Sequence, residues 1–126
     1  MHVTSEVEVT VESNRYAKFV ENMQSKATAD DSELDLIRRV SGLAAEAGEV
    51  VGAQEKFLRK YGTLLSEGDL DHNVEDKITD ELGDTLFWVQ AICNSLGISL
   101  EDLKMSNYKK LTARHPEGFD ATKGRF

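Results

Sequence analysis

Two long stretches of helical periodicity constrain this chain more than any other feature of its sequence. Residues 33–61 and 74–96 contain no proline, and both repeat apolar side chains at the three- and four-residue spacing of an amphipathic helix. Gly62 and Gly97 are suited to ending them. We expect these two helices to form the centre of the fold. In the first, the stripe expected to face the core consists of Leu36, Ile37, Val40, Leu43, Ala44, Ala47, Val51 and Leu58.

Two shorter helices are predicted on either side of this pair. Residues 14–26 and 99–113 also show helical spacing, and the second begins with a serine followed by acidic residues that suit a helix N-terminus. The sequence therefore predicts an all-α four-helix bundle, with residues 13–126 as one domain. Residues 1–12 are predicted to be a short N-terminal extended arm, either a strand or disordered, because valine alternates with polar residues at Val7, Val9 and Val11.

Composition excludes several classes of function. The net charge of −8 argues against binding to a nucleic acid polymer, whose phosphates require a basic surface. The single cysteine, Cys93, rules out an intramolecular disulfide and lies in an apolar run, which favours a buried thiol. We see neither a signal peptide nor an apolar run near the ~20 residues that span a bilayer. We therefore expect a cytoplasmic protein with no membrane partner.

Each of the two long helices carries a pair of acidic residues one turn apart. Glu46 and Glu49 lie among small residues beside the apolar stripe of the first, and Glu81 and Asp84 flank the stripe of the second. In an antiparallel arrangement the two pairs can meet, and the carboxylates would then repel one another unless a cation lay between them. Oxygen ligands suit Mg²⁺, with Mn²⁺ as an alternative. A single pair of this kind is most often a solvated helix face, but two pairs on adjacent central helices favour a metal site.

Cations and one aromatic residue lie near these pairs. Lys56 and Lys60 extend the acidic face of the first long helix and are candidates for phosphate binding, although a solvated helix face explains each of them better when it is taken alone. Trp88 follows the second pair and could stack on a nucleobase or pack between helices.

Four blocks of sequence, taken in order, resemble the MazG-like nucleoside triphosphate pyrophosphohydrolases, which belong to the all-α NTP pyrophosphatase superfamily. The resemblance covers residues 33–119, and the blocks are GLAAEAGEV, DELGDTLFWV, GISLEDL and NYKKLTARHPEGF. The family motif places glutamates on one helix and ExxD on the next. Glu46, Glu49, Glu81 and Asp84 match it. Ala45 stands where the family often has a further glutamate, which leaves the number of metal ions open.

The resemblance implies an enzyme that uses Mg²⁺ to cleave the α–β phosphoanhydride of a (d)NTP, giving a (d)NMP and pyrophosphate. Glu46 or Glu49 would orient or deprotonate the attacking water. The matched positions imply that Asn107, Lys110 and Arg114 contact the phosphates or the nucleotide. The family also implies a homodimer or homotetramer whose subunits share sites.

Two other readings of the sequence remain open. One is a non-catalytic helical module that forms oligomers and keeps the fold without the chemistry. The other keeps the chemistry but applies it to a phosphoribosyl-nucleotide or an alarmone. The sequence leaves the preferred base and sugar undetermined.

Overall fold

The computed structural model describes residues 6–24, 32–118, 120 and 122, with side chains from residue 12 onward. It contains helices α1 (Glu6–Gln24), α2 (Ser32–Tyr61), α3 (His72–Leu96) and α4 (Leu100–Arg114). A two-stranded hairpin, β1 (Leu65–Ser66) and β2 (Asp69–Leu70), joins α2 to α3. The predicted all-α fold is therefore confirmed. None of the helices described here combines the length and the hydrophobicity that a membrane span requires.

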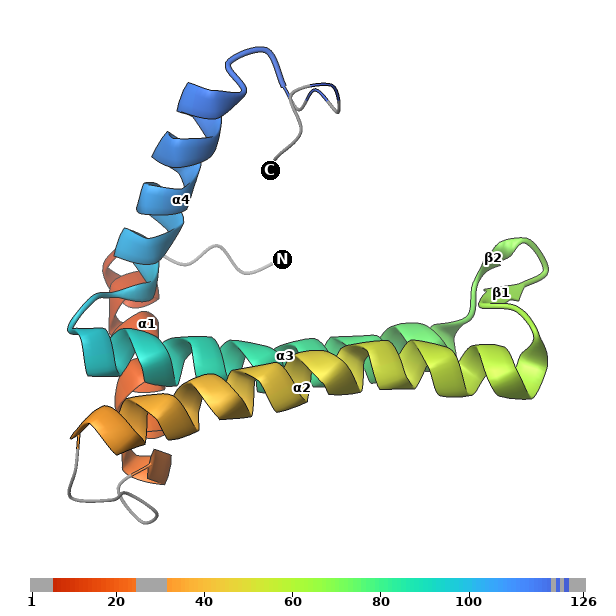
Figure 1. The fold of residues 1–126 in the computed structure, drawn as a ribbon, viewed down its shortest axis with the longest axis horizontal. Coiled ribbons are helices and arrows are strands. Elements are labelled where there is room, and N and C mark those ends of the chain that lie inside the picture. The colour runs from red at the N-terminus through yellow and green to blue at the C-terminus, as the bar shows by residue number, and fades with distance from the viewer. Residues whose placement is uncertain (1–5, 25–31, 119, 121, 123–126) are drawn as a thin grey trace.

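The hairpin between α2 and α3 makes these helices antiparallel neighbours along most of their length (Figure 1). Its tight turn places Glu67 and Gly68 at positive φ, 53° and 95° respectively, a conformation that glycine adopts without strain. Immediately after β2, the Asp71 side chain caps α3 by accepting a hydrogen bond of 2.8 Å from the backbone N–H of Asn73. The acidic connector thus contains a defined turn and a helix cap rather than an irregular loop.

One close contact fixes how α2 and α3 face each other. Gly42 lies directly under the ring of Trp88, and a Cβ atom at position 42 would lie 2.5 to 2.7 Å from three atoms of the indole. Only glycine allows the two helices to approach this closely at that point. From this contact, successive turns of α2 meet α3 in constant antiparallel register.

A polar network holds α1 against α2 and α3. Arg39 is only 2% exposed, and its guanidinium donates to both carboxylate oxygens of Glu21, to Asp35 at 2.8 Å and to the carbonyl oxygen of Ala91. These acceptors come from α1, α2 and α3. Asn94 of α3 adds a hydrogen bond of 2.9 Å to the α1 backbone. The junction of the three helices is therefore built around a buried ion pair with satisfied hydrogen bonds.

The predicted extended arm is wrong for residues 6–12, because α1 begins at Glu6. A lone strand leaves its backbone N–H and C=O groups without partners, whereas a helix satisfies them within one segment. Residues 1–5 lie outside the described part of the chain. The assignment of residues 13–126 to one domain stays a prediction.

Most of the apolar stripe of α2 does not face α3, contrary to expectation, although Leu36 and Leu43 are half-buried. Ile37, Val40 and Val51 are 54%, 50% and 65% exposed, whereas the side with Gly42 and the buried Arg39 lies against α3. Two conditions explain this inversion. The Arg39 ion pair and the Gly42 contact commit the polar side of α2 to the interior. In addition, α4 projects away from the α2–α3 pair and leaves the stripe uncovered within one chain (Figure 1).

We predict that Arg39→Met destabilises the protein by about 3 kcal/mol at pH 7, because Asp35 would lose a buried partner. Hydrogen bonding to Arg39 lowers the pKa of Glu21. Hydrogen bonding to Arg38 lowers the pKa of Asp35, and although burial raises it, the charges of Arg39 and Arg38 lower it further. Because folding lowers the pKa of these two carboxyl groups, their ionised forms stabilise the folded protein above about pH 4. This contribution is lost as the pH falls and the carboxylates are protonated. Arg39→Met should therefore also flatten the acid limb of stability against pH.

Urea unfolding followed by circular dichroism at several pH values would measure both effects. Arg59→Met is the matched control, because the Arg59 side chain is 70% exposed and forms only a surface pair with Glu55. Equal stability of the two variants would contradict the prediction.

Candidate metal centre

Three carboxylates from two helices meet midway along the α2–α3 pair. Glu46 of α2 and Glu81 and Asp84 of α3 each offer an oxygen atom, and these atoms all lie within 4.8 Å of one another. We call them the carboxylate triad. Glu81 and Asp84 share a face of α3 because they are three residues apart, and the antiparallel register places Glu46 opposite them. The Glu81 side chain is 12% exposed, so the triad is partly withdrawn from solvent.

The donor set of the triad suits a hard divalent cation. Carboxylate oxygens are the ligands that Mg²⁺, Mn²⁺ and Ca²⁺ prefer, and no histidine or cysteine takes part in the group. Three negative charges at this spacing repel one another, and a bound cation would reverse that cost. The residues present therefore fit a divalent metal ion.

Two residues that the sequence analysis did not assign to the site border the triad. Lys77 lies one turn before Glu81 on α3, and its Nζ atom is 3.3 Å from Oε1 of Glu81. Tyr16 of α1 lies near Asp84, the second triad carboxylate on α3. Burial, and then the negative charge of Asp84, raise the pKa of the Tyr16 phenol. The i, i+4 spacing of Lys77 and Glu81 was visible in the sequence. The approach of Tyr16 depends on how α1 crosses the pair.

A cleft of about 400 Å³ extends from the triad toward the hairpin, between α2 and α3. Several of the predicted site residues line it, including Glu49, which is exposed and lies outside the triad. Lys56 and Lys60, the predicted phosphate ligands, lie further along the same wall. The complete lining consists of Glu49, Ala53, Lys56, Phe57, Lys60, Tyr61, Asn73, Val74, Lys77 and Glu81.

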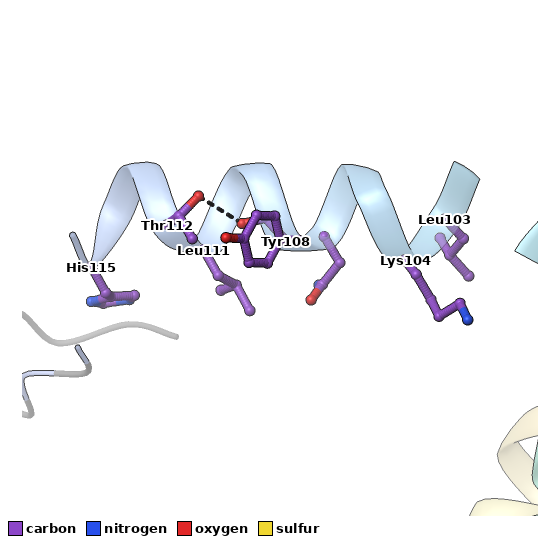
Figure 2. Close-up of a pocket in the computed structure, with 7 residues that line it drawn as sticks. Leu103, Lys104, Tyr108, Leu111, Thr112 and His115 are labelled. Carbon is purple, nitrogen blue, oxygen red and sulfur yellow. Dashed lines mark hydrogen bonds between the residues drawn. The ribbon is translucent and has the colours of Figure 1, made fainter. Parts of the chain in front are cut away.

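The predicted substrate contacts of α4 lie elsewhere. Asn107 lines a hollow of about 640 Å³ along one side of α4, together with the side chains labelled in Figure 2. Lys110 and Arg114 are exposed on the same helix. The cleft lies along the N-terminal half of α3, whereas α4 begins beyond the C-terminal end of α3 and projects away from it (Figure 1). A single chain therefore does not bring these residues of α4 to the triad.

Trp88, the predicted base contact, lies on the other side of the triad from the cleft. Its ring covers Gly42, meets Phe87 edge-on with centroids 5.4 Å apart, and has the Arg38 guanidinium 5.9 Å from its centroid. The structure thus places Trp88 in the packing between α2 and α3.

The fold and the triad together define an all-α protein in which two antiparallel helices present carboxylates to a shared cleft. The chain belongs to the family of the MazG nucleotide pyrophosphohydrolase domain, which matches residues 36–119. Members of this family are generally metal-dependent. The matched region contains the whole triad and all the lysines of the cleft.

The chain is also similar to the Gene 37 protein of Mycobacterium phage L5, with 33% identity over 78 residues. The similar region covers 61% of this chain and 63% of that relative, so it spans less than two thirds of the phage protein. No solved structure matches the chain.

We predict that Glu81→Gln weakens Mn²⁺ or Mg²⁺ binding by more than tenfold, because the amide keeps the shape of the side chain but removes an anionic ligand. Isothermal titration calorimetry measures this affinity directly. Glu55→Gln is the matched control, since Glu55 is an exposed glutamate of α2 paired with Arg59 outside the cleft. Equal affinities in all three proteins would show that the triad does not bind the ion.

Proposed function

We propose that this protein is a Mg²⁺-dependent nucleotide pyrophosphohydrolase that cleaves (d)NTPs at the α–β phosphoanhydride to a (d)NMP and pyrophosphate. The observation that carries the proposal is the carboxylate triad within a MazG domain. The cleft beside it supports the same conclusion, because it places lysines next to carboxylates in a chain of net charge −8. Such local cations favour an anionic ligand despite the overall charge.

The residues of the site divide the chemistry between them. Glu46, Glu81 and Asp84 would hold the metal ion. When bound, the ion would offset the charge of the phosphate oxygens and lower the pKa of water in its shell. Glu49 lies on the cleft wall outside the triad, and is therefore the candidate to orient the attacking water and accept its proton. Water adds to phosphorus, the bridging P–O bond breaks, and pyrophosphate leaves.

Lys56 and Lys60 are the proposed phosphate ligands. Both line the cleft, and their position on the α2 face that also carries Glu46 and Glu49 lets them reach a polyphosphate bound to the metal. Their charges would stabilise the pyrophosphate as it leaves.

We predict Mg²⁺-dependent release of pyrophosphate from one or more members of a panel of canonical and modified (d)NTPs. Glu49→Gln should lower kcat by about 10²–10⁴-fold, the usual contribution of a general base, while leaving Mn²⁺ affinity within a factor of a few. Glu46→Gln should reduce both activity and metal affinity. Glu55→Gln again serves as the control.

The panel should include a phosphoribosyl-nucleotide and the alarmone ppGpp. Hydrolysis of one of these alone would keep the chemistry but change the substrate. If the folded protein releases product from no compound, the proposal fails in favour of a non-catalytic helical module.

We infer further that the protein forms a homodimer or homotetramer with shared sites. The uncovered apolar stripe of α2 supports this inference, because exposed side chains such as Val40 and Val51 on one helix face favour association with another subunit. A second subunit could also bring its α4, with Asn107, Lys110 and Arg114, to the triad of the first. Closed symmetric assembly would cover both stripes.

We predict that Val51→Asp converts the oligomer to a 14.0 kDa monomer, because it places a charge in the stripe. Light scattering after size exclusion measures the mass, with Leu65→Asp in the hairpin as the control. A monomeric wild-type protein would contradict the inference.

Shared sites have a separate consequence: mixing inactive Glu81→Gln and Asn107→Ala proteins should restore part of the activity.

A further inference from the structure

The end of the cleft nearest the hairpin contains a pair of aromatic rings that the proposed chemistry does not use. Phe57 and Tyr61 lie one turn apart on α2, with ring centroids 4.6 Å apart and planes inclined at 45°. Asn73, in the first turn of α3, lies across the cleft from them. We call these three residues the aromatic recess.

The recess is accessible to a ligand. Tyr61 is 56% exposed even though its ring is large and apolar on both faces. The Nζ atom of Lys60 lies over the Tyr61 ring, 5.1 Å from its centroid, which holds a cation beside the recess. The side chain of Asn73 offers both a donor and an acceptor, whereas its backbone N–H is already committed to the Asp71 cap.

The recess and the triad are two ends of one cleft. Glu81 belongs to both the triad and the cleft wall, and Lys56 and Lys77 lie between Glu81 and the rings. Along α2, Glu49 and Phe57 are eight residues apart, which corresponds to about 12 Å at the rise of an α-helix. From the triad outward, the order is therefore carboxylates, then Lys56 and Lys77, then the aromatic rings with Lys60 beside them.

We propose that the aromatic recess binds the nucleoside end of the substrate. The base stacks on Phe57 or Tyr61, the Asn73 amide hydrogen-bonds to the base or the sugar, and Lys77 joins Lys56 in binding the phosphates between the recess and the triad. This inference rests on the proposed function, and it gives the substrate a direction within the cleft. The sequence of chemical groups carries it: a nucleotide bound to a divalent cation presents cation, phosphates and base in the same order.

The proposal gives Lys77 two alternative partners. In this structure its ammonium pairs with Glu81, one of the triad carboxylates. If Glu81 turns to a cation, Lys77 keeps a long flexible side chain that reaches into the cleft, where phosphate oxygens are the stronger acceptors. Lys77 would thus bind the phosphates only when the metal is also present.

Binding of two ligands distinguishes the recess from the rest of the site. A nucleoside triphosphate with an imido group in place of the α–β bridging oxygen resists cleavage, and inorganic tripolyphosphate has the phosphates without the nucleoside. Calorimetry with Mg²⁺ should show that at least one of Phe57→Leu and Tyr61→Leu weakens binding of the nucleotide analogue by about tenfold, the usual effect of losing one stacking ring. Both variants should bind tripolyphosphate as the wild type does.

Three further variants complete the experiment. Tyr61→Phe should restore nucleotide affinity because it keeps the ring, and Lys77→Met should weaken both ligands by a similar factor. Leu65→Ala is the matched control, since Leu65 is an exposed apolar residue of the hairpin and lies outside the lining of the cleft. Circular dichroism of each variant checks that α2 remains folded.

The outcomes separate this inference from the proposed function. Unchanged nucleotide affinity in both ring variants, with hydrolysis still dependent on Glu49, would overturn the recess and leave the enzyme. An equal loss of both ligands in the ring variants would also overturn it, as would a change in molecular mass, which would show that a second subunit covers the rings. Failure of the wild-type protein to bind any nucleotide would overturn both proposals.

Discussion

Arg39 is a charged side chain that is almost completely removed from solvent, and three helices supply its acceptors. A buried guanidinium tolerates few arrangements, because any lost hydrogen bond leaves charge uncompensated in a poorly polarisable environment. It therefore sets the rotation of α2 about its own axis. Glu46 lies seven residues further along α2, two turns away on the same side, so the ion pair that holds α1 in place also directs Glu46 toward α3.

The helices could be predicted from the sequence, as could the four candidate carboxylates, but the exclusion of Glu49 from the triad and the rotation of the helices could not. Periodicity located α2 and α3, and the spacing of Glu81 and Asp84 placed two carboxylates on one face. The apolar stripe then suggested that residues such as Val51 face the partner helix, and this was wrong. A stripe shows which side avoids water, but it does not show whether another helix of the same chain or a second subunit covers it. The N-terminal segment failed for a related reason, since alternating valines indicate a strand only where a partner strand exists.

The two sides of α2 consequently have different uses. The side toward α3 carries the buried ion pair, the carboxylate of Glu46 and the cleft residues Lys56 and Lys60, whereas the outer side carries most of the large aliphatic residues of α2. Lys56 and Lys60 could be recognised as site residues from the sequence, whereas Lys77, Phe57 and Tyr61 could not, because their significance depends on which residues lie across the cleft. Since the polar and apolar functions occupy separate sides, a change in the outer side need not alter the donor set of the triad.

The contact between Gly42 and Trp88 has a consequence for observing this molecule. Trp88 is the single tryptophan of the chain. It follows Asp84 by one turn of α3, and its ring packs on Gly42 of α2. Its fluorescence therefore comes from one place, the interface between the two long helices, with a guanidinium on one side of the ring. Indole emission depends on local polarity and on nearby charge. The protein thus contains its own optical reporter for the separation of α2 and α3, with no label required.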